Sequence, residues 1–139
     1  MRLFSSDTKV EALRAVPLFD GLSKKALETL AQTSEDLDVA PGRVLCREGD
    51  IGHEFFVIVE GEAAVERKGE RIATMGPGDF FGEIALIEHT KRTATVTALT
   101  PLRFFVLASR AFWGLLDSSP EIQGAIMRAL ARRVQAAES

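Results

Sequence analysis

Cysteine is nearly absent from this 139-residue sequence, which contains only Cys46. A single cysteine forms no disulfide within its own chain, and this is compatible with a reducing compartment. Cys46 stands in the segment VLCREG, where the pattern predicts a half-buried strand position, and no histidine lies near it in the sequence. We therefore interpret Cys46 as a packing residue rather than a reactive thiol.

Long apolar runs and a strong positive charge are also absent. The longest apolar runs fall far short of the roughly 20 residues that a membrane-spanning helix needs, and the N-terminus has no charged-then-apolar leader pattern. The formal net charge is −3, whereas a nucleic-acid-binding domain needs a strongly basic face. These absences predict a cytoplasmic protein that contacts neither a membrane nor nucleic acid.

Histidine is scarce, because only His53 and His89 occur and they lie far apart in polar turns. The metal-dependent enzymes of the jelly-roll class need two or three histidines and a carboxylate at close spacing, so we expect neither a metal site nor a cofactor. No serine stands in a Gly-x-Ser-x-Gly elbow, and neither histidine is placed to act as its base. The sequence contains no catalytic constellation, and we predict that the chain is not an enzyme.

Length and composition are those of one folded domain. With 46% hydrophobic and 27% charged residues, the chain is long enough for one self-sufficient core and too short for two. We therefore predict a single domain over residues 1–139. Its expected parts are helices at about 8–34, a β region at about 35–108 and helices at about 109–137.

Helical patterns mark both ends of the chain. After the candidate N-cap Ser23, apolar residues recur at spacings of three and four, as on one face of a helix. Near the other end, Ser109 is a candidate N-cap for a helix over residues 110–117. Ser119 and Pro120 then have the positions of an N-cap and a first-turn proline.

Between these helices the hydrophobic period changes to two. Short runs rich in β-branched and aromatic residues alternate with turns that contain glycine or proline, at intervals of roughly eight to twelve residues. The runs lie at residues 35–39, 43–47, 55–59, 63–66, 71–75, 93–99 and 102–107. Such spacing favours a closed antiparallel barrel or jelly roll of about eight strands. The predicted fold class is therefore mainly β with flanking helices.

The segment from residue 76 to residue 98, GPGDFFGEIALIEHTKRTATVTA, has the residue order that a small phosphate pocket needs. Glycine lets the backbone approach a ligand, and a helical turn that opens at Gly82 points several unpaired N–H groups at one spot. Arg92 follows at the head of a β-branched run, where its planar fork can reach the same phosphate. Glu83 can accept hydrogen bonds from hydroxyls, which indicates a phosphate joined to a sugar.

The part FGEIALIEHTKRTATVTA resembles the phosphate-binding cassette of cyclic nucleotide-binding domains. These modules occur in cyclic-nucleotide-dependent kinases, cyclic-nucleotide-gated channels and catabolite-activator-type regulators. The resemblance covers the chain from about residue 16 to residue 134. It implies an eight-stranded antiparallel β-roll, a jelly-roll-like double-stranded β-helix, with N- and C-terminal helices.

The resemblance also implies roles for single residues. In that family the glycine and the amides after it lie at the phosphate, which here are Gly82, Ile84 and Ala85. The glutamate at Glu83 takes the ribose 2′-hydroxyl, and the arginine at Arg92 pairs with the cyclic phosphate. Many members have proline just before the arginine, where this chain has Lys91, so we expect a looser start of the strand without loss of the site.

Other residues concern the base of the nucleotide. The side chains expected to line the base side are Val65, Met75 and Ile84. Thr93 is expected to place a hydroxyl beside the phosphate, and in the resembling family a threonine or serine there accompanies tolerance of cyclic GMP, although several members with threonine respond to cyclic AMP. The alternative for Thr93 is a strand residue that bonds the phosphate or its neighbours. Counted without gaps from the cassette, Arg133 falls where channel-type relatives place an arginine that folds over the base. The alternative for Arg133 is a solvated helix end.

The resemblance implies a signalling sensor or regulatory module that binds cyclic AMP (cAMP), cyclic GMP (cGMP) or both. Its expected partners are the nucleotide and an unknown downstream protein, and a homodimer is left open. One alternative is a β-roll protein-interaction domain without nucleotide binding, since a glycine-rich turn and an arginine also occur in β-rich proteins without a ligand. A second alternative is the effector domain of a Crp-type transcription regulator that lacks its DNA-binding part.

Overall fold

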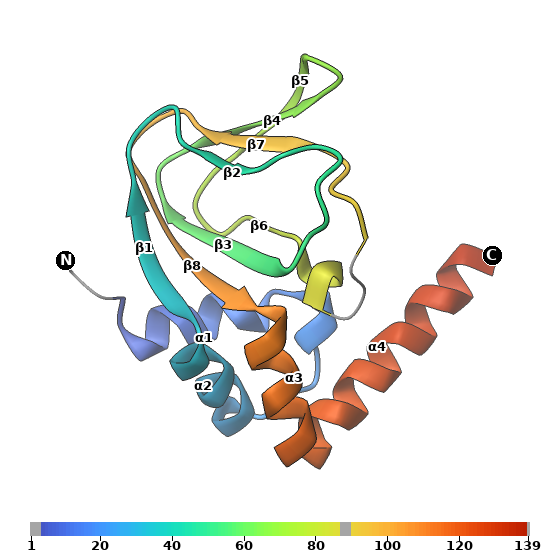
Figure 1. Cartoon of the computed structure of the whole chain (residues 1–139). Helices are drawn as coiled ribbons and strands as arrows, with labels where there is room; N and C mark the ends of the chain where they lie inside the picture. The colour runs from blue at the N-terminus through green and yellow to red at the C-terminus, as the bar shows by residue number, and fades with distance from the viewer. Residues whose placement is uncertain (1–3, 87–89, 139) are drawn as a thin grey trace. The chain divides into compact units, whose positions relative to one another are not determined.

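A computed structural model describes residues 4–86 and 90–138 of the chain (Figure 1), with side chains except those of residues 6, 129, 130 and 132–138. Contacts between residues divide the chain into two compact units. One unit combines Met1–Thr33 with Ala111–Ser139, and the other is Ser34–Arg110. The single domain predicted over residues 1–139 stays a prediction.

The unit Ser34–Arg110 contains eight strands in its described part, arranged as two four-stranded antiparallel sheets (Figure 1). The first sheet has the order β1 (Glu35–Val39), β8 (Leu102–Ala108), β3 (Glu54–Glu60), β6 (Phe80–Phe81). The second has the order β2 (Val44–Cys46), β7 (Thr95–Ala98), β4 (Ala63–Arg67), β5 (Glu70–Met75). The predicted fold class, an antiparallel β-roll with flanking helices, is confirmed.

Side chains from both sheets form one hydrophobic cluster, as the period-two pattern requires. Its buried members come from β3, β4, β7 and β8 and are Phe56, Ile58, Ala63, Val96, Ala98, Leu102, Phe104 and Val106. The alternate residues of β3, Phe55 and Val57, are buried as well. This explains why β3 has a continuous apolar sequence rather than an alternating one.

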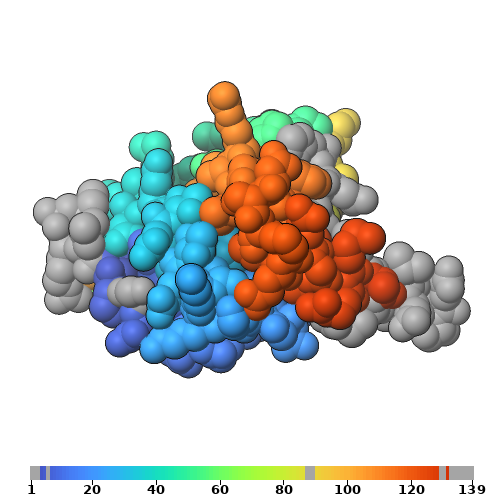
Figure 2. All heavy atoms as spheres, turned by 90° about the horizontal axis from the view of Figure 1, so that it is seen from below, coloured from blue at the N-terminus to red at the C-terminus, as the bar shows by residue number. Residues whose placement is uncertain are grey.

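The other unit consists of helices, several of which begin at capping side chains. Its elements are α1 (Ser6–Arg14), the 3₁₀ turn η1 (Pro17–Phe19), α2 (Lys24–Thr33), α3 (Ser109–Ser118, which begins two residues before the unit) and α4 (Pro120–Glu138). Ser23 Oγ accepts from the Ala26 N–H at 3.1 Å, and Ser119 Oγ accepts from the Ile122 N–H at 3.2 Å. Two of the three predicted N-caps, Ser23 and Ser119, are therefore present. Figure 2 shows the exposed surface of these helices in blue, orange and red.

The start of α3 differs by one residue from the prediction. Ser109 is the first residue of α3 rather than a cap before it, because β8 continues into the helix without a turn. The Ser109 N–H donates to the carbonyl of His53 at 2.8 Å, and Ser109 is buried. Within the described part of the chain, every helix is too short or too polar to span a membrane.

Candidate phosphate-binding site

Arg92 precedes β7, and its main chain is tied to the loop between β2 and β3. Three backbone hydrogen bonds join these segments: Arg92 N–H to Asp50 (2.7 Å), Gly49 N–H to Arg92 (2.8 Å) and Gly52 N–H to Thr90 (3.0 Å). An isolated antiparallel bridge pairs Ile51 with Lys91. The main chain at Arg92 is therefore fixed although β7 begins only at Thr95.

The guanidinium of Arg92 lies against backbone and an aromatic ring. Its Nη2 donates to the carbonyl oxygen of Glu54 at 2.7 Å, and its Cζ lies 5.7 Å from the centre of the Phe56 ring, which is within the range of a cation–π contact. It forms no ion pair with a carboxylate of the described residues. Within the described residues, no acid therefore compensates the positive charge of this half-buried side chain.

Gly82 lies directly beside this guanidinium. Its φ is +83°, a left-handed conformation that residues with a Cβ rarely adopt. A Cβ at Gly82 would clash with Nη1 of Arg92 and would lie 2.6 Å from the carbonyl oxygen of Glu54. The structure thus brings together Gly82 and Arg92, two of the residues that the sequence analysis placed at the phosphate, and the site has no space for a side chain at Gly82.

The predicted helical turn after Gly82 is present as the 3₁₀ turn η2 (Glu83–Leu86), the yellow turn in Figure 1. Glu83 and Ile84 are half-buried, and Ala85 is buried. The Ala85 N–H donates to the carbonyl of Gly82 at 3.0 Å. A phosphate at this amide would have to share it with Gly82 or open the turn.

Two of the three residues predicted for the base side lie on the second sheet, whereas the third, Ile84, lies in η2. Val65 on β4 and Met75 on β5 are half-buried and pack against the hydrophobic cluster. Met75 lies opposite Ala63, and Val65 lies opposite Val96, so their side chains share one face. This apolar surface belongs to the same unit as Arg92 and Gly82.

The segment that carries Arg92 is also joined to the tip of the hairpin between β4 and β5. Arg67 Nε donates to the carbonyl of the exposed Thr93 at 3.0 Å. The Lys68 N–H donates to Glu48 Oε1 at 2.9 Å, and the Glu48 N–H donates to Thr95 Oγ1 at 2.9 Å. The hairpin tip therefore helps to fix the main chain around Thr93.

For some of the predicted residues, the side chain lies outside the described part of the structure. Arg133 belongs to α4, but its side chain lies outside the described ones, as do Ile87 of the predicted apolar segment and His89. No group of three or more histidine, cysteine, aspartate or glutamate side chains in the described part of the chain is arranged to hold a metal ion. The role proposed for Arg133 stays a prediction.

Cys46 on β2 is half-buried and packs against the hydrophobic cluster. Burial raises the pKa of its thiol above the ordinary value, and the positive charge of Arg92 lowers that pKa by a smaller amount. Its Sγ lies 3.6 Å from the carbonyl oxygen of Ala94. The thiol is thus protonated at neutral pH, in agreement with a packing role.

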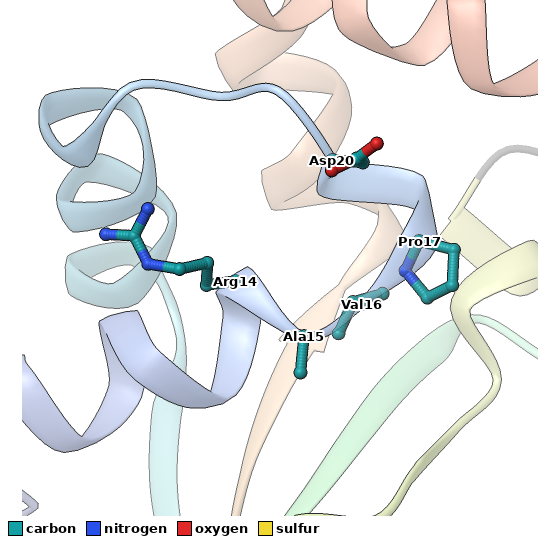
Figure 3. A pocket seen from close by; sticks show the side chains of 5 residues that line it. All are labelled: Arg14, Ala15, Val16, Pro17 and Asp20. Atoms are coloured by element: carbon teal, nitrogen blue, oxygen red, sulfur yellow. The ribbon is translucent and has the colours of Figure 1, made fainter.

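A surface depression of about 320 Å³ lies elsewhere, in the helical unit. Its lining is Arg14, Ala15, Val16, Pro17 and Asp20 (Figure 3). Arg14 points away from the other four side chains in that view and pairs with Glu11 at 3.6 Å. The depression shares no residue with the predicted site, and it lacks a convergent set of polar groups.

Comparison with known proteins identifies the class. The family model of the cyclic nucleotide-binding domain matches residues 37–119, so the chain belongs to this family. A cyclic nucleotide-gated potassium channel of Rhizobium etli is 40% identical over 124 residues, which are 88% of this chain and 35% of the channel. The regulatory subunit of cAMP-dependent protein kinase from Schizosaccharomyces pombe is 35% identical over 111 residues, which are 79% of this chain and 27% of the subunit.

Solved structures agree with this assignment. The N-terminal domain of a transcriptional regulator from Streptomyces coelicolor has a TM-score of 0.84 and 32% identity, over 91% of this chain and 92% of that one. The regulatory domain of Toxoplasma gondii PKA, crystallised with cAMP, has a TM-score of 0.71 and 30% identity, over 78% of this chain and 43% of that one. The chain spans about a third of the length of the potassium-channel and kinase-subunit relatives that it matches. The comparisons indicate no catalytic family.

Proposed function

We propose that this cyclic nucleotide-binding domain binds cAMP, cGMP or both, without turnover, and acts as the sensor of a regulatory protein. The observation that carries the proposal is the placement of Arg92. Its guanidinium has no carboxylate partner in the described part of the chain, lies beside Gly82 and is already held by the Glu54 carbonyl. An uncompensated guanidinium beside a glycine turn is suited to an anion, and the cyclic phosphate supplies one.

In this proposal each part of the nucleotide has its own residues. A guanidinium has five N–H donors, and the bond to Glu54 uses one of them, so donors of Arg92 remain for the phosphate together with Thr93 and the amides after Gly82. Glu83 accepts from the ribose 2′-hydroxyl. The apolar side chains proposed to contact the base are Val65, Met75 and Ile84, and Arg133 is a further candidate there.

Titration with cAMP and cGMP tests the phosphate assignment. A hydrogen bond to a charged group contributes about 1.5–3 kcal/mol, so we expect Arg92→Ala to raise the dissociation constant at least about tenfold, as measured by calorimetry. Arg43→Ala is the matched control. Arg43 is an exposed arginine just before β2, whereas the loop that is bonded to Arg92 follows β2. Equal affinity of Arg92→Ala and the wild type would show that the phosphate assignment is wrong.

Thermal unfolding of the same samples, with and without nucleotide, tests the alternative of a protein-interaction domain that binds no nucleotide. A ligand that binds only the folded state stabilises it by about 2.7 kcal/mol at 100-fold excess over its dissociation constant. We therefore expect the wild type to melt at a higher temperature with saturating nucleotide. No shift with either nucleotide would favour a β-roll domain that only binds protein partners.

The similarity to the N-terminal domain of a transcriptional regulator supports a second candidate, the effector domain of a transcription factor. A DNA-binding segment encoded after residue 139 of the same gene would favour it over a channel or kinase role. We also propose a cytoplasmic location and an unidentified downstream protein partner. Co-purification of a tagged copy with and without nucleotide would test for that partner.

A further inference from the structure

Gly52 is a buried glycine, and its φ angle does not require glycine at this position. It lies in the loop between β2 and β3, and its φ is outside the left-handed region, whereas Gly49 three residues earlier has a φ of +90°. The φ of Gly52 therefore does not require glycine. The space that a side chain would fill provides a reason.

The guanidinium of Arg92 occupies that space. A Cβ at Gly52 would lie 2.7 Å from both Cζ and Nε of Arg92 and 3.1 Å from its Cδ, and these are its three nearest atoms. The three closest conflicts are therefore all with the movable end of one long side chain. A methyl group at Gly52 can be accommodated if Arg92 moves away.

Gly52 belongs to a group of three contacts that hold Arg92, which we call the Arg92 seat. The other two are the Glu54 carbonyl, which accepts from Nη2 at 2.7 Å, and the Phe56 ring, 5.7 Å from Cζ. All three come from one continuous segment, the end of the loop and the start of β3. All three contacts are made by atoms of the protein itself.

We propose that Gly52 is a positioning residue, which lets Arg92 adopt its ligand-binding position before the nucleotide arrives. This inference rests on the proposed function. A side chain that is already ordered loses little freedom on binding, whereas ordering a mobile arginine weakens binding by about two- to tenfold. Gly52→Ala is therefore expected to fold normally and to bind cAMP or cGMP about two- to tenfold more weakly.

A double-mutant cycle tests whether Gly52 acts through Arg92. Dissociation constants are measured for the wild type, Gly52→Ala, Arg92→Ala and the double variant, by competition against a fluorescent cyclic nucleotide. We expect the effect of Gly52→Ala to disappear in the Arg92→Ala background. Gly114→Ala is the control, because a Cβ there would contact nothing within 4 Å; its affinity should equal that of the wild type.

A second readout needs no ligand. In ¹⁵N-labelled protein, the Arg92 Nε–H signal, assigned by its loss in Arg92→Ala, should move in Gly52→Ala and stay in place in Gly114→Ala. An unmoved signal would overturn the inference. Unchanged nucleotide affinity in Gly52→Ala would also overturn it, as would an equal loss of affinity from Gly52→Ala in the wild-type and Arg92→Ala backgrounds. Failure of Gly52→Ala to fold would overturn it too, because only the Arg92 side chain is expected to move.

The two proposals fail in different ways. If Arg92→Ala weakens binding and Gly52→Ala does not, the positioning role is wrong and the proposed function stands. If the wild type binds neither nucleotide, the proposed function is wrong, and no ligand-positioning role remains for Gly52 even if the Nε–H signal moves.

Discussion

At the scale of single residues, the partner of Arg92 decides what the site can bind. A carboxylate at Nη2 would neutralise the guanidinium and repel an incoming phosphate. The Glu54 carbonyl instead orients the guanidinium with a partial charge and leaves its full positive charge in place. Phe56 adds an apolar wall that shields this charge from water on one side. Orientation without neutralisation is what an anion site requires.

Cys46 leads to a prediction about alkaline pH. The raised pKa of its thiol means that the folded protein keeps a proton which the unfolded chain releases above about pH 8.5. The resulting stabilisation is fully present below that pH and is lost as the pH rises through the folded-state value. We expect the stability advantage of the wild type over Cys46→Ala to shrink between pH 7 and pH 10.

Urea unfolding of the wild type and of Cys46→Ala at both pH values provides the measurement. The comparison between the two proteins removes the effects of all other titrating groups, which they share. A stability difference that stays constant or grows at pH 10 would contradict the assignment of a buried, protonated thiol.

At the scale of elements, the starts of α2 and α4 are joined through one serine and one glutamate. Glu121 accepts hydrogen bonds from the Ser23 N–H at 2.8 Å and from the Ser23 hydroxyl at 2.9 Å. Ser23 Oγ also caps its own helix by accepting from Ala26. The carboxylate of Glu121 additionally lies in the first turn of α4, where the helix dipole favours a negative charge.

We therefore expect Glu121→Ala to destabilise the protein by about 1 kcal/mol, since the lost bonds are charge-assisted but exposed to water. Glu121→Gln keeps one acceptor oxygen and should lose less. The free energy of unfolding in urea is the measurement, and Glu70→Ala is the control, an exposed glutamate without a side-chain hydrogen bond in the described chain. Equal stability of Glu121→Ala and the control would show that the hydrogen bonds between Ser23 and Glu121 contribute nothing to the free energy of unfolding.

The elements that the sequence predicted well have regular local patterns. The strands with period-two or continuous apolar sequences were identifiable, as were α2 and α4 with their capping serines Ser23 and Ser119 and the turn after Gly82. The two-residue strand β6 was missed, because it is too short to show any period. The Arg92 seat was missed for a different reason: Glu54 contributes a carbonyl, which every residue type has, and Gly52 looks like one more turn glycine.

At the scale of the whole molecule, all residues proposed for phosphate and ribose belong to the unit Ser34–Arg110, whereas α4 belongs to the other unit. A nucleotide that only filled the unit Ser34–Arg110 would stabilise that unit without transmitting a signal. In a regulatory module, the nucleotide-bound and nucleotide-free states must also differ outside the binding unit. A ligand shifts the equilibrium between two conformations only if it binds one of them more tightly than the other. The proposed sensor function therefore predicts a response outside the binding unit.

Hydrogen exchange along residues 122–134 of α4 measures this response. We expect saturating cAMP or cGMP to slow exchange there as well as in η2 and β7, because amide exchange reports local opening and a helix that becomes ordered opens less often. Arg92→Ala, at the same nucleotide concentration, should leave α4 unchanged if the signal begins at the phosphate. Protection confined to the unit Ser34–Arg110 in the wild type would mean that the nucleotide binds without acting through α4. The output would then have to leave the β-roll by another surface.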